Sequence, residues 1–556
     1  MIGGLRAPTV EAGATKDQAI LCAPRPVSTT TGGRMHKESR ARRKLLVFGG
    51  AIVALNGVTA SPAWADAVTD WNDRTIRATK GFTGATGAGV TLDSNLGSRI
   101  EAIEARAVFD AVNSIDHFSP RSYNYDVSGT GSAAAAAAQA AHDVVLAQLP
   151  DPTSDPSADT RWTQVRTWVD QQLVGDLTAL GVLQSDGGLV AGRAAAVAAN
   201  LARTLDLAAP VTTYGALLTP TSNPGIGLWR QSNAAAAFVN PVTGAPTGFD
   251  ATGVVPQGRP GIDLNWRDVK PFSLSTRQKV SLVADVPLPL VVGSPEYVRE
   301  LEYVRTHGQD VAPASVRSDD QTAQALYYKQ DAEIFINEAA RIASQARGLT
   351  LDQNAKAFAL LANAIADARL AAFDSKYEQK FWRPITALNA GDDGAVTNAY
   401  AAWHPLAATP SHPSNTAGHS ATGAAGFEVL RAIFGDRINP DGSAALLTTL
   451  PWLVGTNSGT GIAATRSVTT FSQAQLENGA SRLYLGVHFG HDNLQGQLLG
   501  LAVADTILAR SKDPAAAGLS IRRSHVSLED LPRTLASRPD LYGVFGGEGG
   551  RPAHGD

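Results

Sequence analysis

The sequence KYEQKFWRP at Lys376–Pro384 is the first of three blocks that decide the fold and the chemistry of this chain. The other two are TPSHPSNTAGHS at Thr409–Ser420 and SRLYLGVHFGHD at Ser481–Asp492. Three of their cations and two of their histidines stand out as candidates for one site: Lys376, Arg383, Arg482, His419 and His488. This inventory suits a pocket for one tetrahedral oxyanion. One histidine would bond the central atom and the other would move protons.

The first block predicts two cations at one site. Lys376 and Arg383 are seven residues apart, close to two helical turns, so both are expected on the same side. Pro384 disfavours helix at Arg383, which we therefore place at a helix end. The planar fork of arginine suits two oxygens of a phosphate-like group, and lysine adds a point charge. Taken alone the pattern is weak, because most Lys and Arg side chains are simply solvated.

The second block predicts a helix N-terminus at the pocket. Gly418 and His419 follow a loop punctuated by prolines and precede an Ala- and Gly-rich helix. Free N–H groups at such an N-terminus face an anion, and glycine allows its close approach. His419 can act as acid or base near neutral pH. The plain alternative is that this Gly-His pair only caps a helix.

The third block predicts a helix break. Arg482 and His488 are six residues apart, about 120° around an ideal helix, so both reach one site only if the helix breaks near Gly486. Asp492 follows His488 by four residues and could accept a proton from one ring nitrogen, leaving the other to attack or ligate. Alternatively the two form a surface pair. His491 lies on another face and is interpreted as a bystander.

Helical periodicity predicts an all-α scaffold. A first antiparallel bundle is expected from four helices, the first opened by a capping box of Ser98 and Glu101: Ser98–Ile115, Ala133–Leu149, 160–182 and 187–208. Five further helices are expected, the first capped by Ser318 and Gln321 and ended by Gly348: 318–348, 351–374, 420–435, 472–486 and 488–510. Strand signals are scarce.

Residues 209–300 are rich in Pro and Gly, and helical periodicity fades there. They form either a long connection or an insertion that lines a pocket, and a loop of this length is expected to be packed. Trp229, Trp266 and Phe272 could anchor it, or could be ordinary core residues.

The N-terminal part of the chain has the features of an export signal. Residues 1–34 are polar and possess no periodicity, and translation is expected to start at Met35. Residues 35–65 combine a basic segment, the apolar run Leu45–Val58 and an A-x-A-like cleavage site ending at Ala65. The alternative is an uncleaved anchor, but the apolar run is short for one. We expect an exported mature chain, periplasmic or secreted, with no stable membrane insertion.

The composition of the chain limits the kinds of partner and the chemical environment that we expect for it. The net charge of −4 does not suggest nucleic acid, and the single cysteine, Cys22, excludes disulfides from the mature chain. No Met or Cys follows residue 35. This absence indicates either compositional drift or work beside a strong oxidant, since these side chains are the most easily oxidised.

The three blocks together resemble the signature of the vanadium-dependent haloperoxidases, which share their active site with the type 2 phosphatidic acid phosphatases: K-x₆-R-P, then P-S-G-H, then S-R-x₅-H-x₃-D. The first and third blocks match in full. In the second, Ala417 replaces the usual serine, which removes a hydroxyl directed at the anion. The resemblance extends upstream, over Trp71–Lys80, Ala105–Asp116 and Ala133–Pro150.

The resemblance implies an all-α fold of two four-helix bundles: residues 66–300 with the N-terminal bundle and the long connection, 301–515 with the C-terminal bundle and the anion site, and 516–556 as an irregular tail. It implies orthovanadate as cofactor, bonded to His488, with hydrogen peroxide and halide as substrates. The oxygens of the vanadate would be held by Lys376, Arg383, Arg482 and the Gly418 N–H, while His419 would move the proton of hydrogen peroxide. His412 occupies a position that holds Phe in chloroperoxidases and His in bromoperoxidases. The resemblance thus favours bromide over chloride, although His412 could be only a loop residue.

Two other functions fit the same residues. In an exported acid phosphatase acting on a small phosphate ester, His488 would attack phosphorus, His419 would protonate the leaving oxygen, and the cations would stabilise the transferred group. The other alternative is a non-catalytic exported protein that retains an anion site, which Ala417 alone supports.

Overall fold

The computed structural model describes residues 66–84, 87–206, 226–229, 262–310, 315–390, 400, 403–450, 465–509 and 513–517. All of them belong to the second of two units, Gly57–Asp556. The upstream segment 1–34, the export signal 35–65, most of the Pro/Gly-rich connection and nearly all of the tail 516–556 lie outside the described residues. Export and cleavage near Ala65 therefore stay predictions.

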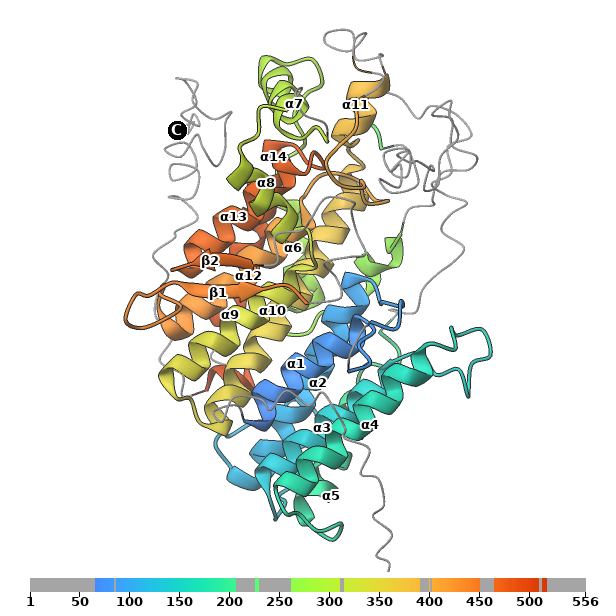
Figure 1. Cartoon of the computed structure of the whole chain (residues 1–556), viewed down its shortest axis with the longest axis vertical. Helices are drawn as coiled ribbons and strands as arrows, with labels where there is room; N and C mark the ends of the chain where they lie inside the picture. Colours follow the sequence, from blue (N-terminus) through green and yellow to red (C-terminus); the bar gives the residue numbers. More distant parts are fainter. Residues whose placement is uncertain are drawn as a thin grey trace, which may run out of the picture. The chain divides into compact units, whose positions relative to one another are not determined.

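Five helices of the N-terminal half pack against one another: α1 (Ala67–Thr79), α2 (Ser94–Asp116), α3 (Ala133–Gln148), α4 (Trp162–Ala179) and α5 (Gly187–Leu201). In Figure 1 they form the blue and teal group. Small residues let α3 and α5 approach closely, because a Cβ at Gly192 would lie only 2.6 Å from the carbonyl oxygen of Ala136. The Ala-rich run of α3 is buried at this contact.

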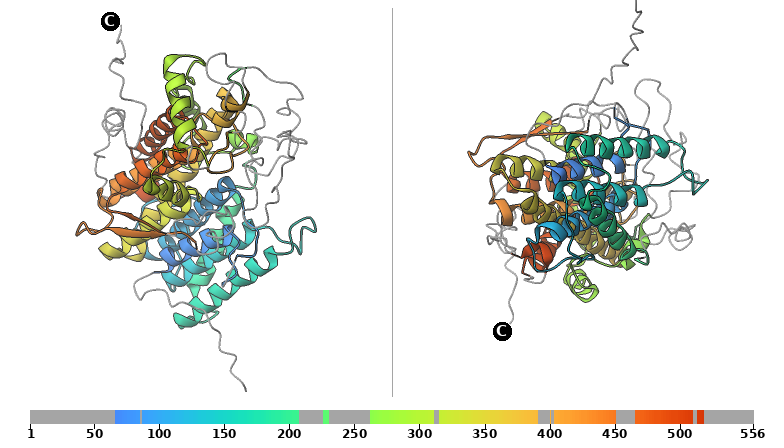
Figure 2. Two further views of the ribbon diagram at one scale, coloured as in Figure 1. Left: turned by 45° about the horizontal axis from the view of Figure 1, so that its top comes forward. Right: turned by 90° about the horizontal axis from the view of Figure 1, so that it is seen from below.

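A second group of helices carries the three sequence blocks: α9 (Ala332–Arg347), α10 (Leu351–Gln379), α12 (Gly418–Phe434), α13 (Phe471–Tyr484) and α14 (Gly490–Leu508). Helix α10 contacts both α12 in this group and α2 in the first, so it joins the two (Figures 1 and 2). A Cβ at Gly500 would lie 2.1 Å from the carbonyl oxygen of Ala421. The absence of a side chain at Gly500 therefore lets α14 pack directly against the backbone of α12.

Shorter elements cover this second group: η2 (Leu264–Asp268), α6 (Thr276–Ala284), α7 (Pro295–His307), α8 (Asp319–Tyr327), α11 (Pro384–Ala390) and η4 (Pro514–Ala516). An antiparallel pair, β1 (Ala445–Thr448) and β2 (Thr465–Val468), is the only sheet among the described residues. The predicted all-α class is confirmed. None of the described helices is both long and apolar enough to cross a bilayer.

One predicted helix start and one predicted helix continuity are wrong. Helix α2 begins four residues before Ser98, where Asp93 accepts the N–H groups of Asn95 and Leu96. Because Asp93 caps the helix at this earlier position, Ser98 lies within α2 and cannot cap it. Glu101 is buried in the interior of the protein. The helix expected over 318–348 is two helices, α8 and α9, separated at Tyr328–Asp331.

The predicted cap and the predicted C-terminal glycine of this segment are confirmed. Ser318 and Gln321 form the capping box of α8, and Gly348 ends α9 with φ of 62°, a left-handed conformation that glycine adopts readily. In the connection, the described part from 262 to 300 contains η2, α6 and the start of α7, so the expected loss of helix is wrong there. Trp229, Trp266 and Phe272 are buried, as a packed connection requires.

Candidate active site

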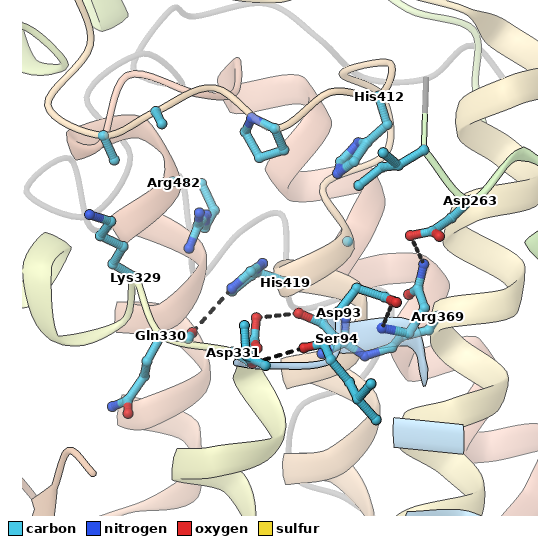
Figure 3. A pocket seen from close by; sticks show the side chains of 18 of the residues that line it. Asp93, Ser94, Asp263, Lys329, Gln330, Asp331, Arg369, His412, His419 and Arg482 are labelled. Carbon is cyan, nitrogen blue, oxygen red and sulfur yellow. Dashed lines mark hydrogen bonds between the residues drawn. The ribbon is translucent and has the colours of Figure 1, made fainter. Parts of the chain in front are cut away.

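One cavity of about 390 Å³ collects the predicted site residues of the second and third blocks (Figure 3). Five predicted residues line it: His412, Gly418, His419, Arg482 and His488. They come from the loop before α12, the first turn of α12, the last turn of α13 and the α13–α14 connection. Positions up to 76 residues apart in the chain thus meet at one wall.

Lys376 and Arg383 lie behind that wall, and both are fully buried. Helix α10 ends at Gln379 and Lys380 turns left-handed, so Arg383 does not share a helix face with Lys376. It immediately precedes α11 instead, at a helix end. The ammonium of Lys376 donates to the carbonyl oxygens of Pro413 and Ser414, each at 2.9 Å. The lysine thereby also holds the loop that leads to α12.

The guanidinium of Arg383 connects the two outer histidines. Its Nε donates to the carbonyl oxygen of His412 at 2.9 Å, and Nη2 lies 2.9 Å from Nδ1 of the same residue. Its Nη1 donates to the carbonyl oxygen of Val487 at 2.6 Å and lies 3.0 Å from Nε2 of His488. Since a guanidinium can only donate, both histidine nitrogens accept. A planar fork is required for this double contact, and lysine could not replace it.

The break that the sequence predicted near Gly486 is present. Helix α13 ends at Tyr484, Gly486 has φ of 76°, and α14 starts at Gly490. His488 lies in the connection, and its Nδ1 is 3.2 Å from Oδ2 of Asp492. Asp492 also accepts the Phe489 N–H at 3.1 Å and the hydroxyl of Ser414. The pair is buried, so the alternative of a surface pair is wrong.

His419 stands at the first turn of α12, whose N-cap position, Ala417, provides no side-chain cap. Its Nε2 lies 3.2 Å from the carbonyl oxygen of Gln330, and its own carbonyl accepts Nδ2 of Asn478 at 2.8 Å. A Cβ at Gly418 would lie 3.7 Å from Cε of Lys376, so the backbone here runs beside the buried lysine. The uncapped N–H groups of this turn are donors suited to an anion.

Ala417 leaves this end of the helix without a hydroxyl. Its side chain is fully buried, and its N–H donates to the carbonyl oxygen of Asp492 at 2.9 Å. The two serines nearest in sequence are engaged elsewhere, since Ser414 donates to Asp492 and Ser420 donates to Asn493. Neither takes the place of the missing serine, so the anion would be held by charges and backbone N–H groups.

Burial and mutual repulsion lower the pKa values of this cluster. Burial, followed by the charge of Arg383, lowers the pKa of Lys376 well below its usual range. Burial lowers the pKa of Arg383 and of Arg482 to about 9. Burial also lowers the pKa of three histidines well below the usual value: His412, His419 and His488. Crowded cations of this kind are stabilised when an anion binds among them.

Among the cavity residues that the sequence analysis missed, three lie in the gap between α8 and α9: Lys329, Gln330 and Asp331. Asp331 occupies the N-cap of α9 but makes no cap there; its carboxylate bonds Lys80 and Ser94 of the first helical group. An Asp-Ala step followed by Glu333 is a helix-start signal that could have revealed the gap. Burial and the nearby Arg482 lower the pKa of Lys329 to about 8.

His491, interpreted as a bystander, does not line the cavity. Its N–H donates to Glu300 of α7 at 2.8 Å, on the far side of the α14 N-terminus. Within the described ranges, no cluster of three or more His, Cys, Asp or Glu side chains could hold a metal cation. The positive charges of Arg383, Lys376 and Arg482 all act on His488, and the carboxylate of Asp492 lies 3.2 Å from its Nδ1. Such a surplus of cations is suited to an anion.

Known proteins are similar to this chain in sequence and fold. Residues 356–516 match the VCPO second helical-bundle domain. The vanadium chloroperoxidase of Curvularia inaequalis is 27% identical over 289 residues, which cover 43% of this chain and 46% of that protein. The chain thus spans about half the length of this curated relative.

Two solved structures share the fold. The first bacterial vanadium-dependent iodoperoxidase aligns with a TM-score of 0.57 and 18% identity over 80% of this chain and 95% of that one. A holo-type bacterial vanadium-dependent chloroperoxidase aligns with a TM-score of 0.52 and 15% identity, over 75% and 91% of the two chains. The fold of the described residues is thus that of these vanadium-dependent haloperoxidases, and residues 356–516 match the second helical-bundle domain of the same group.

Proposed function

We propose that this protein is a vanadate-dependent haloperoxidase that oxidises halide with hydrogen peroxide to hypohalous acid, with bromide favoured over chloride. The observation that carries the proposal is the buried group of Lys376, Arg383 and Arg482 beside His488. Such a concentration of positive charge needs an anion, and the imidazole offers a lone pair to the anion's central atom.

The residues present fit orthovanadate. Nε2 of His488 carries the ring's lone pair, which accepts from Nη1 of Arg383 in this structure, so Arg383 must turn that donor to an anion oxygen when the lone pair bonds the central atom. The Nε of Arg482 is buried and has no hydrogen-bond partner among the described residues, so a donor is available beside the cavity. The carboxylate of Asp492 lies 3.2 Å from Nδ1 of His488 and accepts the hydrogen of that nitrogen. A carboxylate in this position commonly orients a histidine that binds a metal through its other nitrogen.

Bound vanadate supplies a Lewis-acidic centre that activates hydrogen peroxide for attack by halide. In the proposal His488 bonds the anion through Nε2, and the three cations with the Gly418 N–H hold its oxygens. His419 is neutral at working pH because burial lowers its pKa, so it can accept a proton from incoming peroxide. Asp492 accepts a hydrogen bond from Nδ1 of His488 and so keeps the hydrogen of the ring on that nitrogen.

The halide preference rests on His412, which lines the cavity and packs against Phe373 with ring centroids 5.0 Å apart. Its Nδ1 lies 2.9 Å from Nη2 of Arg383 and 3.2 Å from the carbonyl oxygen of Pro413. The shorter contact requires an acceptor, so the neutral ring carries its hydrogen on Nε2. An N–H donor in the wall offers a halide a hydrogen bond that a phenyl ring lacks.

The test is reconstitution of the phosphate-free protein. Titration with orthovanadate should produce bromide oxidation that saturates at one vanadate per chain. Activity that is independent of vanadate, or absent at every vanadate concentration, would reject the proposal.

A further inference from the structure

The cavity is larger than the anion site requires. A tetrahedral oxyanion displaces about four waters, or ~120 Å³ at the liquid volume of ~30 Å³ per water. The cavity holds about 390 Å³, a volume within the range of pockets that bind small organic molecules. More than half of the space therefore remains beside an anion held at His488.

The wall opposite Lys329 and Arg482 has a different character, because carboxylates and apolar side chains lie there beside Arg369. In Figure 3, Asp263 lies across the pocket from Lys329, Gln330 and Arg482. Apolar side chains complete this region, and they include an aromatic ring: Leu92, Ile262 and Phe373. Phe373 is buried, and its ring is tilted by 56° against that of His412, which fixes an aromatic surface beside the site. A flat aromatic ligand would pack well on such a surface.

Asp263 and Asp93 both line this wall without an ion pair to a described residue, and of the two Asp263 also feels the charge of Arg369, which lines the same cavity. Oδ2 of Asp263 accepts Nδ2 of Asn95 at 2.9 Å, and no ion pair joins this carboxylate to a described Lys or Arg. The neighbouring Asp331, by contrast, is paired with Lys80. Burial, followed by the charge of Asp93, raises the pKa of Asp263 to about 7. A cationic ligand would relieve that repulsion.

We propose, building on the proposed function, that this half of the cavity binds an organic acceptor of the oxidised halogen, an aromatic molecule carrying an ammonium group. Its ring lies against Phe373 and its ammonium pairs with Asp263. Hypobromous acid is the two-electron oxidant: an aromatic carbon forms a C–Br bond, the O–Br bond breaks, and the ring proton leaves with the hydroxide as water. Held there, the acceptor meets the oxidised halogen before it diffuses away.

The test uses two phenols with similar rings and opposite charges, tyramine and 3-(4-hydroxyphenyl)propanoate. Equal amounts of both are brominated in one vessel at pH 8, by the vanadate-loaded enzyme or by reagent hypobromous acid. The enzyme should raise the ratio of tyramine product to propanoate product at least tenfold above the reagent ratio. A ratio equal to that of the reagent overturns the proposal, because it would mean that bromination occurs in free solution.

Asp263→Asn should return the product ratio to the reagent value. Asparagine tolerates the left-handed backbone of this position, φ of 58°, and keeps an acceptor for Asn95. Asp268→Asn is the matched control, since Asp268 is exposed in η2 and does not line the cavity. It should behave as wild type; equal ratios for the two variants would contradict the assignment of Asp263.

Binding of tyramine to vanadate-free protein separates this inference from the proposed activity. Calorimetric titration should show affinity at least tenfold weaker in Asp263→Asn than in wild type or Asp268→Asn. If that difference is found but no bromination occurs, the amine site stands and the haloperoxidase proposal falls. Equal affinity in all three proteins overturns the amine site.

Discussion

Nδ1 of His488 lies 3.2 Å from Oδ2 of Asp492, and the opposite ring nitrogen lies 3.0 Å from Nη1 of Arg383. Because the guanidinium only donates, Nε2 must accept and Nδ1 must carry the hydrogen. The contact with Asp492 therefore selects the tautomer whose lone pair is directed toward the cations. This relationship specifies which atom of His488 would bond vanadium, or attack phosphorus.

Removal of the Asp492 carboxylate should weaken the site without removing it. Asp492→Ala is expected to lower vanadate affinity by about 10- to 100-fold, the usual cost of losing a ligand's supporting partner. Asp492→Asn should cost less, because its amide oxygen can still accept from Nδ1 and from the Phe489 N–H. Calorimetric titration of orthovanadate measures both. The exposed Asp441→Ala is the control, and wild-type affinity in Asp492→Ala would show that the pair does not orient His488.

Vanadate should stabilise the folded protein through Lys376. At 100 times its Kd, a ligand that binds only the native state adds about 2.7 kcal/mol of stability, observed as a rise in Tm. In Lys376→Met this rise should be lost, since an apolar side chain replaces a fully buried cation. Lys270→Met, at an exposed position outside the cavity, should keep the rise. An unchanged vanadate response in Lys376→Met would place the anion elsewhere.

Replacing His412 should change the halide preference. His412→Phe removes the ring N–H from the cavity and the acceptor for Arg383, so the ratio of bromide to chloride kcat/KM is expected to fall about tenfold, roughly the value of one hydrogen bond to a charged group. Steady-state kinetics with both halides measure it. His307→Phe, stacked on Tyr303 outside the cavity, is the control. The same ratio in wild type and His412→Phe would refute the selectivity role.

Buried Glu104 predicts a pH-dependent stability. Burial raises its pKa from 4.5 to about 8. The folded state therefore binds a proton that the unfolded state has lost, and stability falls as pH rises from about 4.5 through 8. Against Glu104→Gln, which does not titrate, the wild type should lose roughly 3 to 5 kcal/mol between pH 4.5 and 8.5. Urea unfolding at the two pH values measures the difference, and a constant difference would disprove the shift.

The sequence was sufficient for features that local rules determine. The glycine at 486 and the spacing of Arg482 and His488 required a helix break, and the break is there. The capping box of Ser318 and Gln321 and the end at Gly348 followed from residue type and position. The convergence of Lys376 and Arg383 was also expected, but for the wrong reason, because the helix ends between them.

Features that depend on long-range contacts were missed. The gap between α8 and α9 consists of residues with no strong preference against helix, and Asp331 in it bonds Lys80 and Ser94, more than 230 positions away. Asp263 reaches the cavity through its contact with Asn95, 168 residues earlier. No local pattern predicts such partners. For that reason the cation side of the pocket could be predicted from the sequence, while the opposite wall could not.

The central claim is that His488 bonds a vanadate cofactor rather than attacking a phosphate ester. The most direct measurement assays phosphate-free residues 66–556 for bromide and chloride oxidation by hydrogen peroxide, with and without orthovanadate, and in parallel for hydrolysis of a chromogenic phosphate monoester. Halogenation that requires vanadate and is abolished in His488→Ala is the predicted result. Phosphatase activity that vanadate inhibits, with no halogenation, would contradict the account and give the same residues the roles of a phosphatase.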